Sequence, residues 1–219
     1  MLGAIRRGLR RGKLEPDLAE PLRARMANHP RHLIPARAIR PHPDLVALFV
    51  ANVEREFGTV VRVFGADAVA GAVADYLAAQ NLPTELVAAP HPELRAIDWS
   101  ARPLLALRWG RAEGTDLVSL QLGFAGIAET GTLMLPSGPD RPNTLNLLAD
   151  TEIVVLRASR IVGAYEEAWD RLRAETGGAM PRTVMLVTGP SRSADIEQAL
   201  ELGAHGPRRL HVVLIDDSA

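Results

Sequence analysis

The sequence predicts a three-layer αβα sandwich with a mostly parallel sheet and an antiparallel insertion. Near both ends of the chain, short apolar segments typical of strands alternate with longer amphipathic segments typical of helices. In the middle, closely spaced apolar segments around Gly123, Gly126 and Gly131 indicate hairpins instead of long crossovers. The 219 residues are 47% hydrophobic, which is enough to build one large core.

Residues 1–43 are predicted to form a basic, proline-rich arm that precedes an α/β domain at residues 44–219. Leu2, Ile5 and Leu9 stand at helical spacing beside arginines and indicate a short amphipathic helix. Proline lacks an amide donor and restricts the residue before it, so no long helix is expected between residues 15 and 43. The prolines of this segment are Pro16, Pro21, Pro30, Pro35, Pro41 and Pro43. We interpret it as a tether or a wrapped extension.

The first half of the domain begins with a βαβ pattern. The patterns predict a helix at 44–57, a buried strand at 59–64, an alanine-rich helix at 66–80 and a strand at 84–88. The alternation implies a parallel pairing of the two strands through a right-handed crossover.

The second half is predicted to end in another βαβ pattern. Further strands are expected at 103–107, 117–121, 132–135 and 152–156, and a helix at 163–175. A strand at 183–188, a helix at 193–202 and a strand at 210–215 follow, with His205, Gly206 and Pro207 ending the helix.

The residue types that are missing exclude several kinds of chemistry. Cys is absent, which removes disulfides, thiolate nucleophiles and self-contained iron–sulfur or Cys-type zinc sites. Lys13, in the arm, is the single lysine, so we expect no Schiff-base lysine in the domain. His29 and His32 have no acidic ligand beside them, and no metal site is expected. We also expect no membrane span and no secretion, and hence a soluble cytoplasmic protein.

The net charge of -1 hides an uneven distribution of charge. Residues 1–40 hold 10 basic and 3 acidic side chains, against 15 basic and 23 acidic in the remainder. A basic arm can contact an acidic partner, nucleic acid or its own acidic domain. We favour protein contact over nucleic acid, because no aromatic side chain stands among the arginines to stack on bases.

The strongest local chemistry lies in the segment GIAETGT, which starts at Gly126. Glu129 stands among small and apolar residues in a turn between strands, and Gly131 permits close backbone approach. A desolvated Glu129 would have a raised pKa and could act as a general acid, base or nucleophile. Alternatively, Glu129 caps the turn by accepting amide hydrogen bonds. Both interpretations stay open.

A second motif, GPSRS from Gly189, follows an apolar strand and opens the predicted helix. Free amides, the hydroxyls of Ser191 and Ser193 and the Arg192 guanidinium at the positive end of a helix dipole suit a phosphate or carboxylate. An ordinary N-cap explains the same residues. Arg160 follows the strand at 152–156 and is either a second anion contact or, as we favour, part of a salt bridge between elements.

Four segments occur in one order: GIAETGT from Gly126, SRIV from Ser159, TGPSRSADIE from Thr188 and LGAHGPRRLHVVLIDD from Leu202. Together they resemble the LUD-domain family, of the lactate-utilization protein C type, over residues 59–217. The resemblance implies a fold similar to that of sugar-phosphate isomerases and CoA-transferases. It also implies participation in the oxidation of L-lactate to pyruvate. Iron–sulfur clusters are then expected only in partner subunits, with no cofactor bound by this chain.

Three functions remain at this point. We favour a cluster-free subunit of an L-lactate oxidation system that binds a small carboxylate or phosphate, partner subunits, or both. The second is an independent CoA-transferase-like or sugar-phosphate enzyme with Glu129 as its catalytic residue. The third is a metabolite-sensing module. The expected ligand-binding residues are Gly126, Thr130, Gly131, Thr132, Arg160, Gly189, Ser191, Arg192 and Ser193.

Overall fold

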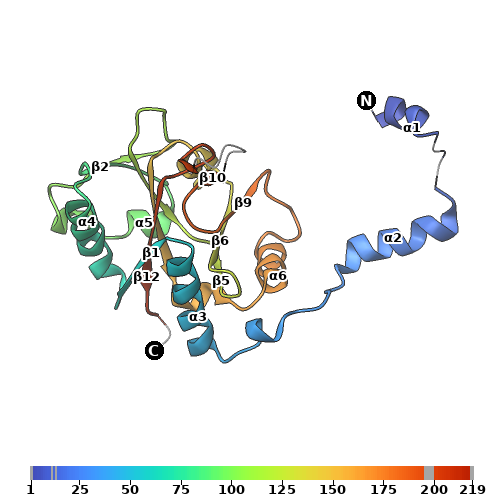
Figure 1. Cartoon of the computed structure of the whole chain (residues 1–219), viewed down its shortest axis with the longest axis horizontal. Helices are drawn as coiled ribbons and strands as arrows, with labels where there is room; N and C mark the ends of the chain where they lie inside the picture. The colour runs from blue at the N-terminus through green and yellow to red at the C-terminus, as the bar shows by residue number, and fades with distance from the viewer. Residues whose placement is uncertain (1, 11, 13, 195–199, 218–219) are drawn as a thin grey trace. The chain divides into compact units, whose positions relative to one another are not determined.

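A computed structural model describes residues 2–10, 12, 14–194 and 200–217 of the chain (Figure 1). The chain divides into two compact units, residues 1–34 and residues 35–219. The smaller unit contains helices α1 (Leu2–Gly8) and α2 (Pro16–Asn28). The larger unit begins at Pro35, so it includes residues 35–43 as well as the predicted α/β domain.

Helix α2 shows that one expectation was wrong, because the prolines do not prevent a long helix in residues 15–43. Pro16 lies in the first turn, where a backbone amide has no partner inside the helix. Pro21 lies one turn further along and removes a single hydrogen bond, and the helix continues to Asn28. Leu18, Leu22 and Met26 recur at helical spacing on α2 and are exposed.

The larger unit is built on a six-stranded sheet in which every neighbouring pair is parallel. Its strands, in spatial order, are β1 (Thr59–Val63), β12 (Arg209–Ile215), β7 (Thr151–Arg157), β4 (Val118–Leu122), β2 (Glu85–Ala88) and β3 (Ala106–Trp109). The mostly parallel sheet is confirmed. Strands β1 and β2 run parallel in this sheet, but three other strands separate them, so their predicted direct pairing is wrong.

A second, four-stranded sheet is the antiparallel insertion that the sequence predicts. It contains β8 (Ile161–Val162), β5 (Ala125–Ile127), β6 (Thr132–Pro136) and β9 (Val184–Val187), in that spatial order. The pairs β5–β6 and β6–β9 are antiparallel, and β5–β8 is parallel. The glycine-rich middle of the sequence therefore forms a hairpin, as expected.

The predicted C-terminal βαβ unit is not present. Strand β9 pairs with β6 in the smaller sheet, while β12 lies in the larger one. In place of the expected helix at 193–202, β10 (Arg192–Ala194) pairs antiparallel with β11 (Leu200–Leu202), and residues 195–199 of that prediction lie outside the described part. Pairing between strands here overrides the helical propensity of the local sequence.

Helices cover both sheets (Figure 1), and three clusters of buried apolar residues lie between helices and sheets. Helices α4 (Val69–Ala79) and α5 (Pro92–Arg95) pack on one face of the six-stranded sheet. Helix α3 (His42–Arg55) packs on its other face together with the smaller sheet. Helix α6 (Tyr165–Glu175) covers the far side of the smaller sheet. Short 3-10 turns lie at Ala36–Ala38, Ala66–Ala68, Trp99–Ala101, Asn143–Asn146 and Ala158–Arg160. None of the helices in the described ranges is long and apolar enough to cross a membrane.

Candidate functional site

The GIAETGT segment is a hairpin turn that is held from behind by helix α3. Asn52 Nδ2 donates hydrogen bonds to the carbonyl oxygens of Ala128 and Glu129, at 2.7 and 3.1 Å. Gly131 has a φ of 68°, and a Cβ atom there would lie 2.6 Å from the backbone nitrogen of Val53. Glycine is therefore required at 131, because both its conformation and its contact with α3 exclude a side chain.

Glu129, the residue with the strongest predicted chemistry, lies in this turn and pairs with an arginine. Arg37 Nη2 donates to Glu129 Oε1 at 2.8 Å, and the two side chains are 59% and 11% exposed. The carboxylate thus accepts a hydrogen bond from a guanidinium, while the Glu129 amide bonds the Gly163 carbonyl. Gly126 lies inside the core, against Phe49 and Leu156. A catalytic role for Glu129 stays a prediction.

Four hydroxyl groups join the two sequence motifs, and we name Thr130, Thr132, Tyr165 and Thr188 the hydroxyl cluster. The Thr132 Oγ1 atom lies 2.6 Å from the hydroxyl oxygens of Thr130 and Thr188, and 2.9 Å from that of Tyr165. Thr132 is buried, whereas Thr188 is exposed at the end of β9. The hydroxyl cluster therefore connects the GIAETGT hairpin to the loop that contains the GPSRS motif.

The loop 188–192 is fixed by its backbone, and it does not begin a helix. Gly189 has a φ of 73° and sits so close to the Glu56 carbonyl, at the end of α3, that a Cβ atom would overlap it. Ser191 donates its amide to the Pro207 carbonyl at 2.8 Å, and its Oγ accepts from the His205 amide at 3.1 Å. The proposed helix-dipole contribution to anion binding is therefore wrong, because strand β10 starts at Arg192.

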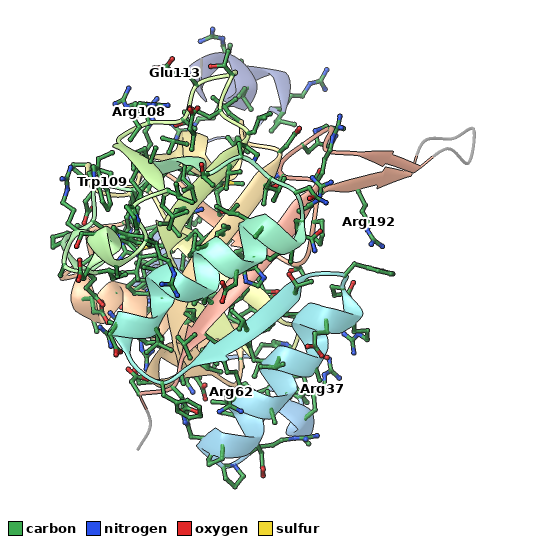
Figure 2. All side chains as sticks on the ribbon, turned by 90° about the vertical axis from the view of Figure 1, so that its left-hand side faces the viewer. Arg37, Arg62, Arg108, Trp109, Glu113 and Arg192 are labelled. Carbon is green, nitrogen blue, oxygen red and sulfur yellow. The ribbon has the colours of Figure 1, made fainter. Side chains whose placement is uncertain are left out.

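The charged residue of this loop, Arg192, stands at the start of the β10–β11 hairpin and is exposed. Figure 2 shows its side chain extending away from the ribbon. Its guanidinium lies over the Phe57 ring, 3.3 Å from the ring centroid. The backbone of Ser193 pairs with Glu201 in the hairpin, and its side chain is outside the described part of the structure.

A cavity of about 240 Å³ opens beside this loop, and we name it the loop cavity. It is lined by Asn146, residues 185–192 and residues 205–207. His205 and Pro207, which the sequence placed at a helix end, form part of its wall. At about 30 Å³ per water molecule, the loop cavity has room for about eight waters, or one small metabolite.

Behind Asn146 lies a buried acid that sequence reasoning missed. Gln121 Nε2 donates hydrogen bonds to Asn146 Oδ1 and to Glu152 Oε1, and all three side chains are buried. Burial raises the pKa of Glu152 to about 8, and the hydrogen bond from Gln121 opposes that rise. No hydrogen-bond partner of Glu152 Oε2 occurs among the described residues. Burial therefore favours the neutral, protonated form of Glu152 at pH 7.

The signal that could have identified this group is the polarity of two buried strands. Ser119 and Gln121 alternate with apolar residues on β4, and Glu152 interrupts the apolar pattern of β7. Ser119 and Glu152 are directly opposite each other in the parallel pair β4–β7. Because both faces of a parallel sheet are covered, polar side chains on its central strands are buried and must be hydrogen-bonded. Such residues therefore indicate a hydrogen-bonded network.

The loop cavity combines groups that suit a small carboxylate or phosphate. Arg192, His205 and Asn146 are among its lining residues, and the Asn146 side chain is held by Gln121 and Asn143. Cationic and amide donors bind carboxylate oxygens well. The other predicted anion contact, Arg160, lies elsewhere. It forms the favoured salt bridge, with both carboxylate oxygens of Glu175 on α6.

The parallel sheet, the inserted hairpin and the loop cavity define an α/β protein with a mixed second sheet. The sequence model of the LUD domain matches residues 46–215, so the chain belongs to the LUD-domain family. The motifs that carried the resemblance thus identified the family correctly.

Individual relatives match a shorter part of the chain. An uncharacterized protein of Neisseria meningitidis is 39% identical over 101 residues, which is 44% of this chain and 43% of that protein. Lactate utilization protein C of Macrococcus caseolyticus is 31% identical over 122 residues, 51% of this chain and 53% of that protein. Lactate utilization protein C of Bacillus subtilis is 32% identical over 130 residues, which is 55% of this chain and 54% of that protein. The matches therefore span about half the length of these relatives.

A solved structure supports the fold. The crystal structure of a DUF162 family protein from Deinococcus radiodurans superposes with a TM-score of 0.61 and 21% identity. The match covers 80% of this chain and 99% of that one. At this identity the similarity establishes the fold alone.

Proposed function

We propose that this chain acts in L-lactate utilization as a cluster-free subunit that binds a small carboxylate in the loop cavity. Relatives named lactate utilization protein C support the process. The observation that carries the ligand class is the composition of the loop cavity, whose lining includes Arg192, His205 and Asn146, with the buried Gln121–Glu152 pair bonded to Asn146. The iron–sulfur clusters needed for electron transfer would be held by partner subunits, because this chain has no Cys ligand.

The electrostatics of the loop cavity favour a single negative charge. Among the side chains that the structure describes, no carboxylate lies within 4.0 Å of the Arg192 guanidinium, which stacks on the Phe57 ring. The protonated Glu152 adds no negative charge behind Asn146. A monocarboxylate of lactate or pyruvate size would place its carboxylate toward Arg192 and its hydroxyl or carbonyl group toward Asn146, whose amide also donates to Asn143 Oδ1 at 3.4 Å.

The Arg192→Gln variant is expected to weaken binding of L-lactate or pyruvate about tenfold to a hundredfold, because it removes a charge-assisted hydrogen bond of about 1.5–3 kcal/mol. Titration calorimetry with L-lactate, pyruvate and neutral lactamide measures this effect. Arg62→Gln is the matched control, because Arg62 is half-exposed and pairs with Asp216 on a different part of the sheet. Absence of carboxylate binding by the wild-type protein would refute the ligand assignment.

The role in lactate utilization requires a separate test in cells. Deletion of the gene is expected to abolish growth on L-lactate as carbon source, and the wild-type chain should restore it. Affinity purification of the restored chain should recover cysteine-rich iron–sulfur subunits. Normal growth of the deletion strain on L-lactate would exclude the proposed role, whatever the loop cavity binds.

A further inference from the structure

A group of partly buried arginine and histidine side chains lies at the edge of the six-stranded sheet opposite the loop cavity. Arg141 contacts the carboxyl end of β4, while His91 follows that of β2 and Arg160 follows that of β7. We name these three residues the edge site. The loop cavity, in contrast, is bounded by Asn146 and Pro207, which precede the amino ends of β7 and β12. We propose that the edge site is a second binding site, which takes the carboxylate group of a small monoanionic metabolite.

The topology of the sheet places the edge site at a position that favours ligands. From β2 the chain continues to β3 on one side, and then returns to β4 on the other side of β2. The connection at the carboxyl end of β2 leads to β3, whereas that of β4 leads to β5 in the smaller sheet, and connections that diverge in this way leave a crevice in open parallel sheets. His91 stands three residues after the end of β2, and Phe124 two residues after the end of β4.

Arg141 is a largely desolvated cation at this position. Its Nη1 donates to the carbonyl of Leu122, the last residue of β4, at 3.3 Å. Burial lowers the pKa of the Arg141 guanidinium, and the charge of Arg160 adds to that effect while Asp140 opposes it. In the described part of the chain, no carboxylate oxygen lies within 4.0 Å of Arg141. The burial of a charge is stabilised when an anion pairs with it.

The ring of His91 supplies a second donor that faces Arg141. His91 Nδ1 accepts a hydrogen bond from the Glu93 amide at 3.2 Å, so the proton of the neutral ring is on Nε2. Burial lowers the pKa of His91, and the charge of Arg141 lowers it further, which favours the neutral ring. His91 Nε2 lies 3.1 Å from Arg141 Nη2, so two N–H donors face each other. An oxygen atom to one side of the pair, about 2.9 Å from each nitrogen, would accept from both.

Arg160 and Phe124 complete the edge site. The guanidinium carbons of Arg141 and Arg160 lie 5.9 and 5.3 Å from the centroid of the Phe124 ring. The charge of Arg160 is balanced by its bond to Glu175, whereas the charge of Arg141 meets carboxylates only beyond ion-pair distance, those of Asp140, Glu93 and Glu175. This balance favours a monoanion, and the buried Phe124 ring supports both guanidinium groups from below.

A carboxylate of the protein already approaches the edge site. Asp140 Oδ2 lies 3.4 Å from His91 Nε2, and its side chain is 42% exposed. The distance exceeds that of a good hydrogen bond, and the exposed side chain can turn toward solvent. Asp140 therefore acts as an internal competitor that a metabolite carboxylate displaces.

The proposal predicts opposite effects for two neighbouring substitutions. Asp140→Asn should tighten binding of acetate or pyruvate severalfold, because it removes the competing charge. Arg141→Met should weaken binding at this position at least tenfold. The readout is the NMR signal of the His91 ring, assigned with His91→Asn, during titration with acetate, pyruvate, inorganic phosphate and neutral acetamide. In the wild type, acetate and pyruvate should shift the signal to saturation and acetamide should not.

The controls separate this proposal from the loop cavity. Arg192→Gln should leave the titration of the His91 signal unchanged, so failure of either site is visible independently. Weaker binding in Asp140→Asn, or an equal response to acetamide, would overturn the proposal even if Arg141→Met fails to fold. Saturation by phosphate without a response to acetate would show that the ligand class is wrong.

Discussion

Between pH 6.5 and 8 the wild-type protein is expected to lose stability as pH rises, and replacing Glu152 by glutamine is expected to remove that loss. The pKa of Glu152 rises from its ordinary 4.5 to about 8 in the folded protein, because the carboxyl is buried. Between these values the folded state holds a proton that the unfolded state releases, so the free energy of unfolding falls as pH rises. Glutamine resembles the protonated acid and has no proton to lose.

The titration of His211 changes the free energy of unfolding in the opposite direction, and so affects how stability is expected to depend on pH. It lies on β12 beside β7, stacked on Tyr76 on the face covered by α4, and burial lowers its pKa from 6.5 to about 4. Between pH 4 and 6.5 the unfolded state binds a proton that the folded state does not, so stability rises with pH. The effects of Glu152 and His211 therefore nearly cancel between pH 4.5 and 6.5.

Above pH 6.5 only the Glu152 effect remains, at up to about 1.4 kcal/mol per pH unit, or about 2 kcal/mol by pH 8. Urea unfolding of the wild type and of Glu152→Gln at pH 5, 6.5 and 8 measures the difference. The variant should gain about 2 kcal/mol from pH 5 to 6.5 and then stay level. Parallel profiles for the two proteins would show that Glu152 is ionised in the fold.

Much of the fold follows from local patterns in the sequence. The apolar segments at 132–135 and 152–156 are strands because each is too short for a helix and is bounded by turn residues. Gly131 marks the hairpin turn correctly, since its φ of 68° strains any residue with a side chain. Segment 183–202 shows the limit of this approach. Its strands pair with β6 and with each other, and periodicity says nothing about which partner a strand chooses.

The candidate site could be predicted only in part, because its members come together through the sheet. Thr132 and Thr188 both stand in recognisable motifs, but the hydrogen bond between them depends on the pairing of β6 with β9. Gln121 and Glu152 are 31 positions apart in sequence and become neighbours only because β4 pairs with β7. The motifs thus located one wall of the loop cavity. The buried Glu152 behind it could be found only from the order of the strands in the sheet.

The Gly189→Ala variant is expected to be the most destabilising single change in the GPSRS motif. The φ of 73° at Gly189 disfavours any residue with a side chain, at a cost of about 1–2 kcal/mol. The added methyl group would also overlap the Glu56 carbonyl oxygen at the end of α3, which adds about 1–3 kcal/mol for overpacking. Because the loop must move away from α3 to relieve this overlap, carboxylate binding in the loop cavity should weaken as well.

Gly177→Ala is the matched control, because it separates backbone strain from the contact with α3. Gly177 has a similar φ of 60°, and a Cβ atom there would meet no atom within 4 Å. Its substitution should therefore cost only the conformational part, about 1–2 kcal/mol, and leave carboxylate binding unchanged. Urea unfolding and calorimetry of both variants measure the difference. Equal losses of stability in the two variants would mean that the loop does not rest on Glu56, and the position of Arg192 in the loop cavity would then need another support.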